Sequence, residues 1–252
     1  MKKLVLTLIA LVSFSVASLQ AQDAFDTQMK AYKLALKNYD LQAATVCLYQ
    51  AIALKPERKD LNDSMALLYF AGERYAQAFI IGEEILKENP KRNDMLELVA
   101  VSKQSLGLVK ESLADYEKLY AADKSIYYLY QIATLQYQLK RYGECVASLD
   151  QVIANPESAK QKVNIVVQGG SQDVAMKAAA LNVKGICAME LNQDEAAKDN
   201  FNKALAESPE FVLAKGNLDM LAKKQAQTKQ PAAPAKTPSS TVKTTTAPTS
   251  PK

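Results

Sequence analysis

The spacing of apolar residues in one short stretch predicts an amphipathic helix. In residues 196–210, AAKDNFNKALAESPE, apolar side chains lie at Ala197, Phe201 and Ala204, and Pro209 follows. Steps of three and four residues place these side chains on one face of an α-helix. A proline cannot continue a helix because it lacks the backbone N–H. We therefore expect a helix with one buried face that ends near Pro209.

The same pattern occurs in four earlier copies. Its first position recurs at steps of 34, 34, 33 and 52 residues and is occupied in turn by Ala44, Ala78, Ser112, Cys145 and Ala197. Twelve residues before it, four of the five copies have a small residue: Ala66, Ala100, Ala133 and Gly185. Small residues let two antiparallel helices approach closely. A single pair cannot bury its apolar face alone, so the pairs are expected to stack.

This 34-residue period, with its small, aromatic and proline positions, resembles the tetratricopeptide repeat family over about residues 27–211. The Trp of the family consensus is absent. The resemblance implies an all-α, right-handed superhelical solenoid of about five helix-turn-helix repeats plus a C-terminal capping helix, over residues 23–226. The expected repeats span about 25–58, 59–92, 93–125, 126–158 and 178–211, with an insertion at 159–177 and the cap at 211–226.

The insertion has a different pattern from the repeats. Val163, Ile165 and Val167 occupy alternate positions, and the pair Gly169-Gly170 is a turn signal. A short β-hairpin and an irregular lid both fit this pattern. The insertion is either tolerated on the surface or in contact with a partner, since insertions in solenoids often fall on the binding face.

The N-terminal segment, residues 1–22, has the pattern of a secretory signal peptide of the bacterial kind. Lys2 and Lys3 precede an apolar run from Leu4 to Val16. An uncleaved anchor is the alternative, but thirteen residues are short against the roughly 20 that span a bilayer. We expect cleavage near Ala21 or Gln22, a periplasmic or otherwise exported protein, and no stable membrane insertion afterwards.

The C-terminal segment, residues 227–252, is rich in Pro, Thr, Ser, Ala and Lys and is expected to be disordered. Six lysines from Lys223 onward, together with Lys2 and Lys3, account for eight of the 31 basic residues. The remaining 23 basic residues compare with 27 acidic residues, so the net charge of +4 is the sum of −4 for the body, +6 for the C-terminal lysines and +2 for Lys2 and Lys3. The body has no basic face with interleaved aromatic residues, so we expect no nucleic-acid partner.

The sequence offers no catalytic constellation. It contains no His, which removes the commonest general base and zinc ligand, and it has no glycine-rich phosphate loop. We expect no enzyme activity, no catalytic residues, no cofactor and no metal. Three cysteines are present, and Cys145 is expected to be a buried small residue, with a disulfide to Cys187 as the alternative. The redox states of Cys47, Cys145 and Cys187 are left open.

The resemblance implies that the first helix of each repeat lines a concave groove that binds an extended or helical peptide. The register of the repeats predicts which side chains face this groove. They are Asp63, Leu67, Phe70, Glu97, Val101, Gln104, Tyr127, Tyr130, Thr134, Tyr137, Asn182, Ile186 and Met189. Tyr127, Tyr130 and Tyr137 share one helix face, and tyrosine is frequent in binding hot spots. Ordinary packing between repeats is the alternative for these tyrosines.

Family members that bind a terminal carboxylate use Lys and Asn in this groove. This sequence has acidic residues at its N-terminal end instead, namely Asp60, Asp63, Asp94 and Glu97. They argue against a carboxylate-terminated ligand and favour a basic or neutral one. We therefore expect a non-catalytic interaction or scaffold module of the bacterial cell envelope, which binds a peptide or protein in its groove. The alternative is a permanent structural subunit of an envelope assembly or secretion complex.

Overall fold

The computed structural model describes residues 22–229, so the expected signal peptide and most of the expected tail lie outside the described residues. The first helix spans residues 22–37. The other helices are α2 (Leu41–Leu54), α3 (Asp60–Ala71), α4 (Tyr75–Glu88), α5 (Asn93–Ser105), α6 (Val109–Asp123), α7 (Ile126–Gln138), α8 (Tyr142–Ala154), α9 (Met176–Glu190), α10 (Asp194–Glu207) and α11 (Val212–Lys229). A short 3₁₀ turn (Pro156–Ala159) and the strands β1 (Lys162–Val167) and β2 (Gly170–Ala175) lie between α8 and α9.

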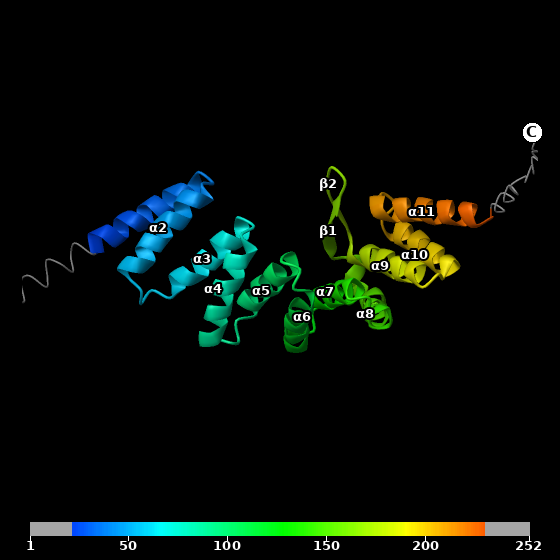
Figure 1. The fold of residues 1–252 in the computed structure, drawn as a ribbon, viewed down its shortest axis with the longest axis horizontal. Helices are drawn as coiled ribbons and strands as arrows, with labels where there is room; N and C mark the ends of the chain where they lie inside the picture. The colour runs from blue at the N-terminus through cyan, green and yellow to red at the C-terminus, as the bar shows by residue number, and fades with distance from the viewer. Residues whose placement is uncertain (1–21, 230–252) are drawn as a thin grey trace, which may run out of the picture.

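Each helix packs on the next along the chain, and the pairs follow one another in an arc (Figure 1). The first helix pairs with α2, α3 with α4, α5 with α6, α7 with α8, and α9 with α10. These contacts between neighbours build an all-α repeat solenoid, which confirms the expected fold class. Helix α11 follows the fifth pair as a cap and ends at Lys229, three residues beyond the expected end at 226.

The repeat period is visible in the backbone of the turn inside each pair. One residue of that turn has a left-handed conformation in all five pairs: Tyr39, Glu73, Gly107, Lys140 and Asn192, with φ between 56° and 76°. These residues lie five positions before the first position of the sequence pattern, so they recur at the same steps of 34, 34, 33 and 52. The turn geometry, like the packing, therefore repeats with the sequence.

The recurrent positions form the core. The five residues at the first position of the pattern are fully buried, with exposed fractions of 0%: Ala44, Ala78, Ser112, Cys145 and Ala197. Ser112 is polar, and its hydroxyl donates a hydrogen bond of 2.8 Å to the carbonyl of Ala100 in the partner helix of its pair. A buried hydroxyl is tolerated when it is hydrogen-bonded, which explains how the weaker third copy keeps the same packing.

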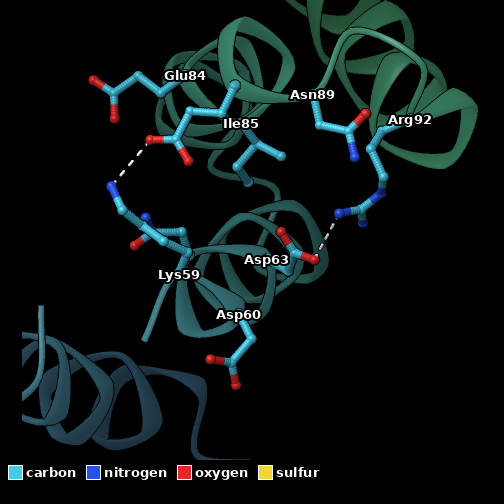
Figure 2. Close-up of a pocket in the computed structure, with 9 residues that line it drawn as sticks. Lys59, Asp60, Asp63, Glu84, Ile85, Asn89 and Arg92 are labelled. Atoms are coloured by element: carbon cyan, nitrogen blue, oxygen red, sulfur yellow. Dashed lines mark hydrogen bonds and ion pairs between the residues drawn. The ribbon is translucent and has the colours of Figure 1, made fainter. Parts of the chain in front are cut away.

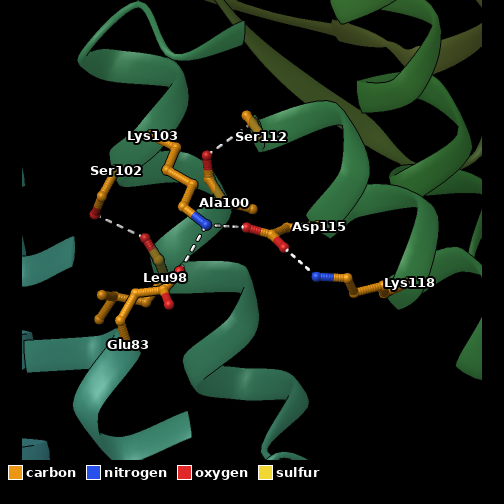
Figure 3. A network of polar contacts seen from close by, with 8 residues as sticks. All are labelled: Glu83, Leu98, Ala100, Ser102, Lys103, Ser112, Asp115 and Lys118. Carbon is orange, nitrogen blue, oxygen red and sulfur yellow. Dashed lines mark hydrogen bonds and ion pairs between the residues drawn. The ribbon is translucent and has the colours of Figure 1, made fainter. Parts of the chain in front are cut away.

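A buried network of charges joins the second and third repeats (Figure 3). Lys103 Nζ on α5 lies 2.7 Å from Glu83 on α4 and 2.6 Å from Asp115 on α6. Lys118 contacts the second carboxylate oxygen of Asp115 at 2.8 Å. The side chains of Lys103 and Asp115 are only 10% and 4% exposed, so each charge depends on the other.

The insertion forms an antiparallel hairpin rather than an irregular lid, with β1 and β2 in the register Val167↔Gly170. Its turn lies at Gln168 and Gly169, one residue earlier than the glycine pair suggests, and Gly169 has a φ of +88°. The hairpin stands out from the helices beside α11 (Figure 1). The side chain of Gln172 fastens it there, because it donates to the Glu210 carbonyl at 2.6 Å and accepts from the Val212 N–H at 3.0 Å.

Within residues 22–229, none of the helices has the length and apolar character needed to cross a bilayer.

Candidate functional site

An apolar pocket lies along the first helices of the second, third and fourth repeats. It has a volume of about 490 Å³. Six of the residues mapped to the groove from the sequence line it: Asp63, Leu67, Phe70, Glu97, Val101 and Tyr127. These side chains come from α3, α5 and α7, so the repeat brings residues together that are up to 64 positions apart. Leu67 is 57% exposed, which leaves apolar surface open to a partner.

An ion-paired arginine that the sequence pattern did not indicate also lines this pocket. Arg92, in the connection between α4 and α5, contacts Asp63 on α3 at 2.9 Å and both carboxylate oxygens of Asp94 at 2.9 and 2.7 Å. The hydrogen bond from Arg92 holds the pKa of Asp94 below its usual value. Arg92 does not lie on a helix face, so the helical register gave no signal for it.

The other side of the Asp63–Arg92 pair borders a polar notch of about 350 Å³ between α3 and α4 (Figure 2). Figure 2 shows the ion pair of Arg92 with Asp63 at this notch. Lys59 forms a second ion pair there with Glu88, at 3.0 Å. The lining of the notch is mostly charged, and these cross-links hold α3 against the end of α4. We assign the notch a structural role and place the candidate site in the apolar pocket.

The acidic residues at this end of the groove already have partners within the protein, so they are less available to bind a basic ligand than the sequence suggests. Asp63 and Asp94 share Arg92, and Asp60 forms its own pair with Arg58 at 2.6 Å. Glu97 accepts a hydrogen bond of 2.8 Å from the hydroxyl of Tyr128. The expected preference for a basic ligand is therefore weakened, because two arginines offset part of the negative charge of the four carboxylates.

Tyr128 is a second residue that the register did not indicate. It is 9% exposed, and its ring meets that of Tyr127 edge to face with the centroids 5.6 Å apart. Burial, followed by the hydrogen bond to Glu97, raises the pKa of Tyr128 above its usual value. Tyr128 thus holds Glu97 and braces Tyr127, so it positions two residues of the pocket from beneath.

The groove continues from Tyr127 toward the hairpin. A second hollow of about 390 Å³ is lined by Gln104 of α5, by α7 residues that include Tyr127, Tyr130 and Thr134, and by residues 162–165 of β1. Tyr127 belongs to both hollows, so it joins them. The inserted hairpin is therefore a wall of the groove, a position that the sequence pattern did not specify.

The three tyrosines of α7 do not form one exposed stripe. Tyr127 is half-buried and faces the groove, whereas Tyr130 is 5% exposed and belongs to the core between α7 and the hairpin. Tyr137 lines neither hollow and packs against Tyr142 of α8, with the ring centroids 6.0 Å apart. Tyr137 and most of the Tyr130 side chain therefore have a packing role inside the protein. Tyr127 is the tyrosine of this helix that a partner can reach.

The groove residues expected on α9 are covered by the cap. Asn182 is 4% exposed and accepts a hydrogen bond of 2.9 Å from Asn217 of α11. Ile186 and Met189 pack around a small core that also involves Leu218. Because α11 takes the place that the next repeat would occupy, it covers this face of α9, and the groove ends at the hairpin.

The described residues show no arrangement of side chains that would hold a metal ion. Among residues 22–229, no group of three or more Cys, Asp or Glu side chains is arranged to hold a metal ion, and the chain has no His. The groove contains apolar side chains, amides and paired charges. Such a surface is typical of ligand-binding sites.

Comparison with models of known families gives no match, and no curated protein matches the sequence. Comparison with solved structures does give matches. A tetratricopeptide repeat protein from Parabacteroides merdae ATCC 43184 has a TM-score of 0.63 at 17% identity, over 81% of this chain and 75% of that one. YrrB, described as a TPR protein with an unusual peptide-binding site, has a TM-score of 0.58 at 16% identity, over 77% and 88%.

MamA from Desulfovibrio magneticus RS-1 has a TM-score of 0.58 at 12% identity, over 75% of this chain and 98% of that one. The fold is a tetratricopeptide-repeat solenoid. At these identities the likeness establishes the fold, and a fold does not determine the ligand.

Proposed function

We propose that this tetratricopeptide-repeat solenoid is a non-catalytic interaction module that binds a peptide segment of a partner protein in the groove between α3, α5, α7 and β1. One observation carries the proposal: six side chains from three successive repeats line a single apolar pocket of about 490 Å³. A pocket of this size and character is typical of binding sites. The printed description of YrrB as having a peptide-binding site supports the same use of the fold.

The proposal is tested with peptides selected by the full chain from a random-peptide display library. The Leu67→Glu variant should lose about 1–4 kcal/mol of binding free energy for the selected peptides, as is usual for a hot-spot residue. Its free energy of unfolding should change by less than about 0.5 kcal/mol, because Leu67 is 57% exposed. Isothermal titration calorimetry and urea unfolding measure the two quantities.

Ile80 provides the matched control. It is 55% exposed and also aliphatic, but it lies on α4 and lines neither hollow of the groove. The Ile80→Glu variant should bind the selected peptides as the wild type does. If both variants bind equally well, or if no peptide is selected, the groove is not a peptide site.

A permanent structural subunit is the second candidate function. It would use the second helices of the repeats, where Val46 and Tyr49 of α2 and Ile80 of α4 are all more than half exposed. In that case the protein purified from its native membrane extract should be part of a stable complex that Ile80→Glu dissociates and Leu67→Glu does not. The opposite pattern supports the groove.

The N-terminal sequence supports a place in the bacterial cell envelope for this module. Expression of the full chain with a C-terminal tag, followed by fractionation and N-terminal mass spectrometry, tests it. A periplasmic product that begins at Gln22 supports the proposal, and a cytoplasmic product that begins at Met1 contradicts it.

A further inference from the structure

The wall of the groove that β1 forms has an open strand edge. The turn of the hairpin has two residues between Val167 and Gly170, and in such hairpins the flanking residues exchange both backbone hydrogen bonds. The pairs then alternate, so Ile165 and Val163 also bond to β2. The backbone groups of Lys162, Asn164 and Val166 consequently point away from β2.

Two observed hydrogen bonds confirm this alternation. The N–H of Met176 donates to the carbonyl of Gln161 at 2.8 Å, as a bonded pair should. The N–H of Ala175 points outward from β2 and donates to the hydroxyl of Ser208 at 3.3 Å. The outer edge of β2 is thus in contact with the segment that leads into α11.

The outer edge of β1 faces the groove instead. Four consecutive residues of β1, 162–165, line the hollow with Tyr127 and Tyr130, and consecutive residues point to opposite faces of a strand. The hollow therefore meets β1 at its edge. Within the described part of the chain, the outward backbone groups of Asn164 and Val166 have no hydrogen-bond partner.

We propose that the peptide in the groove is extended and adds to β1 as a third strand. The inference rests on the proposed function and specifies how the peptide is held. Pairing would satisfy the backbone groups of Lys162, Asn164 and Val166, which is how β-augmentation gives affinity without a fixed sequence. In such a strand, every second side chain of the peptide would lie on the same face of the sheet as Val163 and would contact Tyr127 and Tyr130. We therefore expect every second residue of the ligand to be apolar.

Proline scanning of the two strands tests the pairing. The Asn164→Pro variant removes an outward N–H and keeps the bonds between β1 and β2, because proline is tolerated at strand positions whose N–H does not take part in pairing. It should weaken binding of a library-selected synthetic peptide at least tenfold. Two versions of the peptide, one N-methylated at its odd residues and one at its even residues, give a second test. The version whose methyl groups replace the N–H groups that pair with β1 should also bind at least tenfold more weakly.

Ser171→Pro is the matched control, because Ser171 lies opposite Val166 and its N–H points outward from β2. Both changes break the contact between the Asn164 amide and the Ser171 hydroxyl. Asn164→Pro also removes the 2.7 Å hydrogen bond from that amide to Asp173, so Asn164→Ala, which loses the amide but keeps the backbone N–H, is the second control and should bind as the wild type does. Ser171→Pro should leave peptide affinity within about twofold. Amide hydrogen exchange of Asn164 and Val166 should slow when the peptide is bound to the wild type.

The outcomes separate this inference from the proposed function. If Leu67→Glu abolishes binding while Asn164→Pro and N-methylation do not, the peptide lies in the groove without pairing, and strand addition is overturned. If Asn164→Pro and Ser171→Pro weaken binding equally, the effect comes from the hairpin as a whole, and strand addition is also overturned. If no peptide binds at all, the proposed function fails with it.

A separate observation concerns two cysteines that are distant in the sequence. Cys145 on α8 and Cys187 on α9 are both fully buried, and their sulfur atoms lie 3.5 Å apart. Cys47, in contrast, is partly exposed on α2. In the sequence, the two buried thiols lie on either side of the hairpin insertion. In the structure, they lie where α8 of the fourth repeat packs against α9 of the fifth.

We infer that Cys145 and Cys187 form a disulfide when the protein meets a disulfide donor such as oxidised glutathione. One thiolate attacks the donor and releases one glutathione thiol, and the other then attacks the mixed disulfide and releases the second. Two protein thiols are oxidised to one S–S bond, and the donor disulfide is reduced to two thiols. Because both sulfurs are buried, the exchange requires α8 and α9 to separate locally or occurs during folding.

Refolding the full chain from urea in a glutathione redox buffer tests this inference. After alkylation, mass spectrometry should find one modified cysteine, Cys47, and a linked peptide pair that contains Cys145 and Cys187. The oxidised form should have a higher midpoint of thermal unfolding than the reduced form, because the link restrains the unfolded chain. Cys187→Ala should abolish this difference, and Cys47→Ala should keep it. Three alkylated cysteines, or a link to Cys47, would overturn the inference.

Discussion

The ring of Phe201 on α10 lies against Gly185 on α9 so closely that a Cβ atom at position 185 would be 2.4 Å from Phe201 Cε1. Gly82 on α4 has a similar relation to Val99 on α5, where an added Cβ would be 2.5 Å from Cγ2. No side chain larger than hydrogen fits at either position without a shift of its neighbour. The close approach within the fifth pair, α9 to α10, and the close approach between the second and third pairs, α4 to α5, therefore each depend on a glycine.

Gly185→Ala should destabilise the protein by about 1–3 kcal/mol, because the methyl group overpacks the core against the Phe201 ring. Urea unfolding measures the change. Gly216→Ala is the control, since Gly216 lies in α11 and nothing is within 4 Å of an added Cβ. It should stabilise the helix by up to about 1 kcal/mol. Equal effects of the two substitutions would mean that the packing at Phe201 is looser than the structure shows.

The buried network of Lys103 and Asp115 yields a second prediction. Asp115→Leu leaves Lys103 buried with Glu83 as its remaining anionic partner and should cost roughly 3 kcal/mol of stability, as expected when one partner of a buried pair is removed. The double variant Lys103→Met with Asp115→Leu should recover most of this loss, because no buried charge remains unpaired and Glu83 is 39% exposed to water. A double variant as unstable as the single one would show that the network contributes packing rather than charge pairing.

The fold could be predicted from the sequence because each helix pair has the same spacing of small and bulky apolar residues, and this spacing recurs about every 34 residues in the first four copies. Ala197 and Phe201, with Gly185 twelve residues upstream, carry the helix-pair packing in their own short stretch, and each copy repeats it. The same register located the part of the groove between Asp63 and Tyr127, since equivalent positions of successive first helices must share a face.

The rest of the site depended on contacts that no repeat register describes. Arg92 lies between helices, so its pairing with Asp63 is set by the connection and not by a helix face. The repeat register predicts Asn182 in the groove, but the cap helix covers it, with Asn217 donating a hydrogen bond to its side chain. The hairpin was visible as an alternation, yet its position against α7 depends on tertiary contacts alone.

The contrast between Tyr127 and Tyr130 yields a third prediction. Tyr130 is 5% exposed, so Tyr130→Ala should cost about 3–5 kcal/mol of stability, as large-to-small core substitutions do. Tyr127 is half-buried in the groove wall, so Tyr127→Ala should cost less than half as much and should reduce the affinity for selected peptides. Thermal unfolding and calorimetry on both variants distinguish the two roles, and a reversal of their effects would contradict the placement of the groove.

The hydroxyl of Tyr130 yields the last prediction, a pH dependence. Burial, with a smaller effect of Tyr127, raises the pKa of Tyr130 to about 12, whereas an unfolded tyrosine has a pKa of about 10. The folded state therefore holds this proton more tightly, and the resulting stability is complete below about pH 10 and is lost as the pH rises toward about 12. Over this window the wild type should lose about 2–3 kcal/mol more than Tyr130→Phe, which has no proton to release. Urea unfolding of both proteins at a series of alkaline pH values measures the difference, and parallel curves would show that the Tyr130 hydroxyl is reached by solvent in the folded state.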